Sequence, residues 1–188
     1  MTPMPHEQPR SQGSWNIPES ALSVQSLQLV IGYHFYTDTF LHRALTRLAW
    51  AKEQGLDDDA HMDALATLGD AVIELIALDT LVHAGITEKG HMSKIKMNNV
   101  NMSVLRDLAL QINLQDYVYW GRGEAHMQIW TSGRVLAECM EALIGAIYLD
   151  GGIDAARSVL CTCGFLEKLT SDAAVDLPKL PKTKRKEE

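Results

Sequence analysis

The sequence has little of what would mark a secreted, membrane-spanning or disulfide-bonded protein. It contains 3 cysteines, Cys139, Cys161 and Cys163, an odd count without the spacing of a zinc site. The polar N-terminal residues include no apolar run that could serve as a signal peptide or a membrane span. We therefore expect a soluble, cytoplasmic protein with reduced thiols and no membrane contact.

Proline is absent from the middle of the chain, and so is any alternating strand pattern of useful length. All 6 prolines lie before residue 19 or after residue 177, which leaves an uninterrupted stretch suited to long helices. A chain of 188 residues with 46% hydrophobic content is long enough for one packed core. We predict an all-α domain over residues 21–168, a disordered N-terminal tail over 1–20 and a flexible basic tail over 169–188.

An excess of positive charge is also missing. The net charge of −7 argues against a protein whose whole surface binds a polyanion, because phosphate contacts dominate nucleic-acid affinity. Local basic patches remain possible, and the C-terminal KLPKTKRKEE is one such run. A short run of this kind is more typical of a solubilising tail than of an RNA-binding arm.

Apolar periodicity predicts a series of helices separated by glycine or polar breaks. A polar break, EQGLDDDA, should separate the second helix from the third, and YWGRGEAH should be a loop. The first expected helix spans residues 19–31, and the second has its apolar face at Phe40, Leu41, Ala44, Leu45 and Leu48. The following helices are expected at residues 62–84, at the lysine-bearing segment SKIKMNNVN, at 104–112, at 134–150 and, as the last, from Ile153 onward.

The predicted helix RVLAECMEALIGAIYLD, residues 134–150, is apolar almost all round yet carries Glu138 and Glu141 one turn apart. Such a helix should be buried on nearly all sides, so both carboxylates should point into a confined space. Like charges at this spacing repel, and the repulsion grows once they lose water. A divalent metal ion between them is the economical expectation.

The helix expected over residues 62–84 carries acids of its own, Asp63, Asp70 and Glu74, opposite its apolar stripe. Taken alone, such a stripe is usually a solvated face. Each acid-bearing helix also has a glycine near its acids, Gly69 and Gly145. Glycine costs a helix about 1 kcal/mol relative to alanine, so we expect close helix approach or access to a bound group there.

These two segments resemble the signature motifs of the ribonuclease III family. LATLGDAVIELI resembles the family's ERLEFLGDAVLEL, and VLAECMEALIGAIYLDGG resembles ILADAFEALIGAIYLDGG almost word for word. LVIGYHFYTDTFLHRALTR and GHMSKIKMNNVNMSVLRDLALQINLQDYVYWGRGE also have counterparts in the family. The resemblance covers about residues 24–165, in order and with sensible gaps.

The resemblance implies an all-helical ribonuclease III endonuclease domain that forms a homodimer around double-stranded RNA. In the family, four carboxylates hold Mg²⁺, with Mn²⁺ as a possible alternative, for phosphodiester cleavage. Position by position, Asp70, Glu138 and Glu141 match three metal ligands, and Asp70 and Glu141 are the expected catalytic residues. The fourth ligand falls on Ala66, and Asp63, one turn earlier, is a candidate to act through a water.

Further departures from the family are Ala64, Thr67, Lys89 and Arg47, the last standing where the family motif ALTH has histidine. Many members also append a double-stranded-RNA-binding domain, which this sequence does not include. Affinity for RNA would then come from residues of the domain, from the basic tail or from a separate partner protein. The candidate RNA-binding residues are Lys94, Lys96, Arg106, Arg122 and Arg134.

Two functional interpretations follow. The first is a metal-dependent endoribonuclease that makes staggered cuts in structured RNA and leaves 5′-phosphate and 3′-hydroxyl ends. The second is a catalytically impaired relative that acts as a double-stranded-RNA-binding or ribonucleoprotein scaffold. Buried charges such as Glu138 and Glu141 in an apolar helix cost stability, so their presence favours the enzyme. Ala66, which replaces a metal ligand, favours the scaffold.

Overall fold

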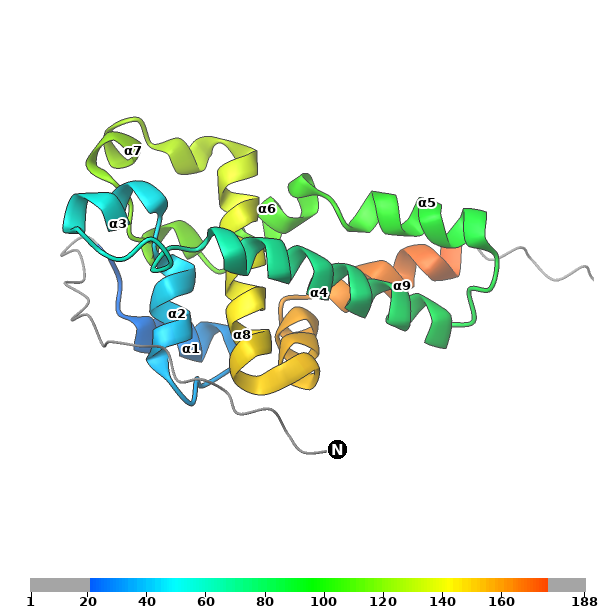
Figure 1. The fold of residues 1–188 in the computed structure, drawn as a ribbon. Coiled ribbons are helices and arrows are strands. Elements are labelled where there is room, and N and C mark those ends of the chain that lie inside the picture. The colour runs from blue at the N-terminus through cyan, green and yellow to red at the C-terminus, as the bar shows by residue number, and fades with distance from the viewer. Residues whose placement is uncertain (1–20, 176–188) are drawn as a thin grey trace, which may run out of the picture.

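The computed structural model describes residues 21–175, and these residues form helices joined by short connections, with no strand longer than one isolated bridge (Figure 1). The elements in chain order are α1 (Val24–Ile31), α2 (Asp38–Leu45), α3 (Leu48–Gln54), α4 (Asp63–His83), α5 (Lys89–Asn99), α6 (Met102–Gln111), η1 (Leu114–Asp116), α7 (Arg122–His126), η2 (Ile129–Thr131), α8 (Gly133–Thr162) and α9 (Phe165–Val175).

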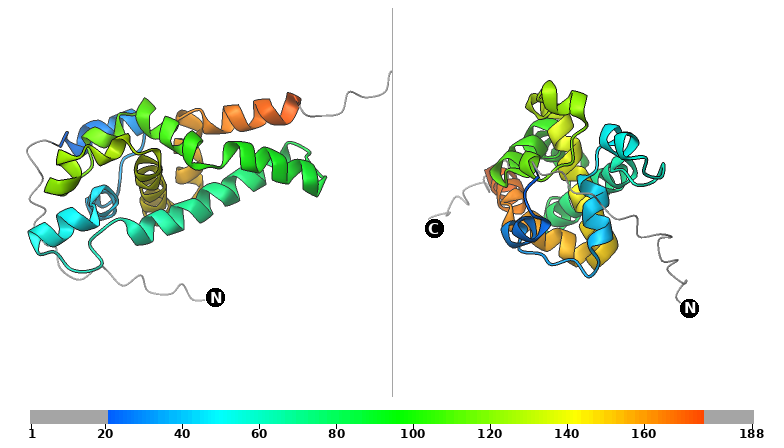
Figure 2. Two further views of the ribbon diagram at one scale, coloured as in Figure 1. Left: turned by 90° about the horizontal axis from the view of Figure 1, so that it is seen from above. Right: turned by 90° about the vertical axis from the view of Figure 1, so that its left-hand side faces the viewer.

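The first half of α8 is the central helix of the domain. It packs against α2, α4 and α6, and Figure 2 shows it enclosed by other helices when the molecule is viewed from above. Apart from Glu138, every residue from Leu136 to Ile147 is buried. The all-round apolar sequence of this segment therefore corresponds to burial on all sides, as its pattern predicts.

The two acid-bearing helices, α4 and α8, cross in backbone contact at Gly69 and Gly145. A Cβ atom added to Gly69 would lie 1.8 Å from the carbonyl oxygen of Glu141, and one added to Gly145 would lie 2.2 Å from that of Leu65. No side chain fits at such distances. The glycines are therefore explained by close helix approach, which is one of the two reasons that the sequence suggests.

The C-terminal half of α4 extends to one side of the molecule together with α5 and α9 (Figure 2). Lys96 of α5 donates to Glu74 of α4 over 2.6 Å. Arg157 joins the second half of α8 to α4 through Asp79 over 2.8 Å. The two ion pairs thus link α4 to α5 and to the second half of α8.

Most of the helices predicted from periodicity are confirmed, including the long ones at 62–84 and 134–150. The chain also turns after Asp150, where Gly152 has φ +77° inside the segment spanned by α8. Cys139, Cys161 and Cys163 are all free thiols. Within residues 21–175, no helix combines the length and the apolar character that a membrane crossing requires.

Two local predictions are wrong. The single helix expected through Leu45 and Leu48 is broken at Thr46, which is extended and forms a bridge with Tyr119. The Tyr119 backbone N–H donates to Leu45 over 2.7 Å, and such a distant contact leaves no trace in local periodicity. The predicted loop YWGRGEAH contains the short helix α7, whose first turn is closed by the Glu124 side chain accepting from the Gly121 N–H.

Two further expectations need correction. Helical spacing in the sequence predicts Leu75 on the apolar face of α4 together with Leu68 and Val72, but 56% of its surface is exposed. The sequence predicts a domain that ends at residue 168, but α9 continues to Val175 and buries Leu169 and Ala173, so the folded part extends past that boundary. The N-terminal tail predicted over 1–20, and residues 176–188 of the basic tail predicted over 169–188, lie outside the described residues.

Candidate functional site

The acid-bearing faces of α4 and α8 line one pocket, with a volume of about 510 Å³. We call it the acid pocket. Its other walls are the start of α3 and the start of α6. The lining residues are Arg47, Leu48, Met62, Asp63, Ala66, Thr67, Asp70, Met102, Arg134, Glu138 and Glu141.

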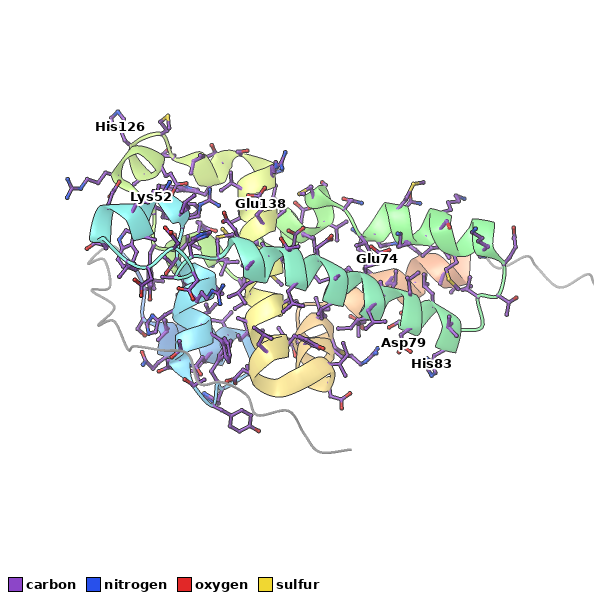
Figure 3. All side chains as sticks on the ribbon, in the orientation of Figure 1. Lys52, Glu74, Asp79, His83, His126 and Glu138 are labelled. Atoms are coloured by element: carbon purple, nitrogen blue, oxygen red, sulfur yellow. The ribbon has the colours of Figure 1, made fainter. Side chains whose placement is uncertain are left out.

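The helical repeat of α4 brings Asp63, Ala66 and Asp70 to the pocket, because positions three and four apart share a face. The same spacing on α8 brings Glu138 and Glu141 to it. The glycine crossing then sets the two rows of acids against each other, since Asp70 follows Gly69 directly and Glu141 lies one turn before Gly145. In Figure 3, Glu138 lies near the N-terminal end of α4, whereas Glu74 lies further along α4, beside α5.

Glu141 is the most unusual group of the pocket. Its residue surface is only 7% exposed, and it is a buried carboxylate in a helix otherwise buried through apolar groups. Loss of water, and after it the nearby charges of Asp70 and Glu138, raise the pKa of Glu141 to about 7, with Arg134 partly opposing the shift. The fold thus places two like charges near the buried carboxylate of Glu141, an arrangement that a bound cation would stabilise.

Glu138 has arginine partners on both sides. Its Oε1 accepts from Nε of Arg134 over 2.9 Å, and its Oε2 lies 3.8 Å from Nη1 of Arg47. Arg134 has 77% of its side chain exposed, whereas Arg47 has 15%. The pocket therefore combines acids with two guanidinium groups.

The donor set suits a hard cation, because Mg²⁺ prefers carboxylate oxygens and readily keeps water ligands. As the side chains stand, however, no three acidic, histidine or cysteine groups within residues 21–175 lie close enough together to enclose an ion. Ala66, 8% exposed in the pocket wall, leaves the place of a further carboxylate vacant. Asp63 is 57% exposed in its side chain and lies 3.3 Å from His61 Nδ1.

Of the candidate RNA-binding residues, Arg134 lines the acid pocket, whereas Lys94, Lys96 and Arg122 lie elsewhere. Lys94 and Lys96 are on α5, where the Lys96 ammonium group is engaged by Glu74. Arg122 begins α7 with 91% of its side chain exposed and approaches Glu53 to 3.9 Å. None of the three lines the acid pocket. The less exposed arginine of the pocket is Arg47, which the sequence shows only as a departure from a motif. Its placement depends on the Thr46–Tyr119 bridge, which no local signal predicts.

Comparison with known proteins assigns the domain. A family described as ribonuclease-III-like matches residues 37–165. Ribonuclease 3 of Bdellovibrio bacteriovorus is 36% identical over 137 residues, which cover 72% of this chain and 58% of that protein. Ribonuclease 3 of Aliivibrio fischeri is 31% identical over 166 residues, covering 88% of this chain and 71% of that protein. The chain thus spans less than two thirds of the length of the first of these relatives.

Solved structures agree with this likeness. The nuclease domain of ribonuclease III from Campylobacter jejuni, described for flexibility in its region of dimer formation, aligns with a TM-score of 0.68 and 26% identity. The alignment covers 76% of this chain and 96% of that domain. The all-helical architecture described above is therefore that of a known nuclease domain.

Proposed function

Because the chain belongs to the ribonuclease III family, we propose that it is a metal-dependent endoribonuclease that cleaves double-stranded or structured RNA during RNA processing. The observation that carries the proposal is the acid pocket, which Asp70 of α4 and Glu138 and Glu141 of α8 line together beside a glycine crossing. A buried acid such as Glu141 is costly to keep unless a charged ligand makes use of it.

In this proposal Asp70, Glu138 and Glu141 hold Mg²⁺, or Mn²⁺ in its place. When bound, the ion would activate a water and stabilise the charge that develops on the phosphate. The water attacks phosphorus and the bond to the 3′ oxygen breaks, so the products carry a 5′-phosphate and a 3′-hydroxyl. Glu141 must be ionised to act as a ligand, and Arg134 orients Glu138 through its hydrogen bond. At Ala66 a water would stand where a carboxylate oxygen is missing, with Asp63 as its hydrogen-bond partner.

We further propose that the protein works as a homodimer. Exposed apolar side chains follow α4 at helical spacing, at Ala71, Leu75 and Val82, with Leu75 at 56% and Val82 at 58% exposure. An exposed apolar stripe along one helix is a candidate surface for contact with another protein chain. A second copy would add its own acid pocket to the surface that faces RNA, and a separate RNA-binding protein is the other source of affinity.

A scaffold function is the second candidate, and specific observations favour it. Ala66 removes a ligand, and the acids are not drawn together tightly enough to enclose an ion in the described structure. Glu138 already has an arginine partner. A protein of this kind would bind structured RNA without cutting it.

Cleavage of long double-stranded RNA in Mg²⁺ or Mn²⁺ tests the proposal. The purified protein is compared with Glu141→Gln and with Glu74→Gln, a matched control on α4 whose partner is Lys96 rather than the pocket. The proposal expects cleavage by the parent and by Glu74→Gln, with 5′-phosphate ends, and none by Glu141→Gln. If the parent binds the RNA but does not cleave it, the scaffold function is favoured.

A further inference from the structure

Arg47 is a partly buried cation of the acid pocket, and hydrogen bonds of its own backbone and of the two preceding residues fix its position. Its N–H donates to the Tyr119 carbonyl over 3.3 Å, and the Tyr119 N–H donates to Leu45 over 2.7 Å. The neighbouring Thr46 carbonyl accepts from the N–H of Met62, just before α4, over 2.9 Å. The break between α2 and α3 thus attaches Arg47 rigidly to the start of α4.

One edge of the Arg47 guanidinium group is used within the protein. Its Nε and Nη2 each lie 3.0 Å from Oε1 of Glu124, whose other oxygen accepts from the Gly121 N–H over 3.2 Å. The Arg47 Cζ atom lies 5.9 Å from the centroid of the Trp120 ring. The side chains of Arg47 and Glu124 are only 15% and 12% exposed. The group is therefore held in one orientation before any ligand arrives.

The other edge, at Nη1, faces the acid pocket with donor capacity to spare. Its neighbours are the Glu138 Oε2 at 3.8 Å and the Met62 sulfur at 3.8 Å. The first distance is too long for a hydrogen bond between nitrogen and oxygen, and a thioether is a weak acceptor. Glu138 is held more closely by Arg134, at 2.9 Å. A strong donor thus lies in the acid pocket beside Glu138, without a strong acceptor of its own on this edge.

We propose that Arg47 binds the RNA phosphate in the acid pocket, donating through Nη1 to a non-bridging oxygen on the side where Ala66 removes a carboxylate. The inference rests on the proposed function, because it takes the ligand to be an RNA phosphodiester. A site with fewer acids attracts less metal charge, and a pre-oriented guanidinium supplies positive charge toward the phosphate directly. Arginine suits this position because it stays charged and its donors lie in a rigid plane that matches phosphate oxygens.

A purely structural ion pair with Glu124 is the alternative explanation of Arg47. It accounts for Nε and Nη2 but gives Nη1 no function. The two explanations differ in what removal of the whole pair does. If the pair is only structural, RNA binding follows the stability of the fold; if Nη1 binds phosphate, RNA binding falls while the fold is retained.

The test measures binding of a fluorescent double-stranded RNA in a Glu141→Gln background, where cleavage is not needed for the readout. The double variant Arg47→Gln/Glu124→Gln removes the pair without leaving either charge buried alone. It is compared with Glu124→Gln, which keeps the cation. Arg157→Gln is the control for loss of an arginine from an ion pair elsewhere, since Arg157 pairs with Asp79. Thermal melting monitors the fold of each variant.

We expect the double variant to bind roughly tenfold more weakly than Glu124→Gln, the size of effect typical of one charged hydrogen bond. The slope of log affinity against log salt should become shallower by about 0.9 for each phosphate that no longer has a cationic partner. Arg157→Gln should match the background in both quantities. If the double variant does not fold, Arg47→Lys replaces it, with a weaker affinity at an unchanged salt slope as the expected result.

Equal affinity and equal salt slope for the double variant and Glu124→Gln would overturn the proposal, and so would the absence of RNA binding in the background. The nuclease proposal is judged separately by cleavage with the parent. If the parent does not cleave RNA but binds it in a way that depends on Arg47, the nuclease proposal is wrong and the phosphate contact is supported. If the parent cleaves RNA and its RNA binding does not depend on Arg47, the nuclease proposal is supported and the phosphate contact is wrong.

Discussion

At the scale of single residues, Glu141 determines the electrostatics of the site. The carboxylate is buried at the helix crossing, and burial, followed by the charges of Asp70 and Glu138, raises its pKa to about 7. An acid whose pKa is raised on folding holds its proton more tightly in the folded chain than in the unfolded one. The folded protein therefore loses stability as the pH rises from the ordinary value of 4.5 to about 7.

Replacing this acid should stabilise the protein in the absence of metal. At about pH 8 we expect Glu141→Gln to raise the free energy of unfolding by about 1 to 3 kcal/mol, since each pKa unit corresponds to about 1.4 kcal/mol. Near pH 5 the gain should be much smaller, because the parent is then largely protonated at this site. Urea unfolding of both proteins in metal-free buffer at the two pH values measures the difference. A parent as stable as the variant at the higher pH would contradict this account of Glu141.

Ala66 is the second residue with a distinct expectation. Ala66→Glu adds a carboxylate to the wall of the acid pocket, one turn before Asp70. It should strengthen Mn²⁺ binding roughly tenfold by replacing a water ligand with a charged oxygen, and it should lower stability without metal through repulsion. Calorimetric titration at limiting metal measures the affinity, and Ala66→Gln separates charge from size. An unchanged affinity would mean that this position is not the weak point of the site.

At the scale of elements, the crossing of α4 and α8 is what converts two rows of acids into one site. The helix backbones are in contact at Gly69 and Gly145. If the two helices moved apart, Asp70 and Glu141 would also be separated. The site and the packing of the two helices therefore depend on the same contact.

A methyl group at this crossing should damage both stability and the site. We expect Gly145→Ala to lower the free energy of unfolding by about 2 to 4 kcal/mol, because the added Cβ would lie 2.2 Å from the Leu65 carbonyl oxygen. Gly123→Ala is the control: it lies in α7 with nothing within 4 Å, so it should be neutral or slightly stabilising. Chemical denaturation compares the two, and equal stability would show that the helices can separate at no cost.

The elements also show what the sequence can and cannot predict. α4 and the first half of α8 are predicted well because their apolar residues recur at helical spacing over many residues. The close crossing is also indicated by the sequence, because glycine destabilises a helix and its presence there needs another reason. The break at Thr46 and the helix α7 are not predicted, because a contact with Tyr119 and a cap from Glu124 determine them. The place of Arg47 escapes prediction for the same reason: its neighbours in space come from distant parts of the chain.

At the scale of the whole molecule, a net charge of −7 has to be reconciled with RNA as the proposed ligand. The arginines of the acid pocket supply local positive charge, and a second copy of the chain would double it across the RNA. The exposed stripe on α4 is the surface through which we expect that copy to attach.

Leu75→Glu should therefore separate the dimer. A charge in the middle of an apolar contact costs several kcal/mol when it loses water, which is enough to shift a dimer to monomers at micromolar concentration. Sedimentation velocity over a range of concentrations measures the change. Leu149→Glu, on α8 with 43% exposure, is the matched control and should keep the oligomeric state of the parent. A parent that is monomeric throughout would contradict the proposed homodimer.

Central to the proposed function is that Asp70 and Glu141, from two different helices, hold the same divalent ion. Calorimetric titration of Mn²⁺ into the parent, Asp70→Asn and Glu141→Gln, above the pKa of Glu141, tests it most directly. We expect the parent to bind Mn²⁺, each of the two variants to lose most of this affinity, and Glu74→Gln to bind as the parent does. Variants that bind Mn²⁺ as tightly as the parent would contradict it.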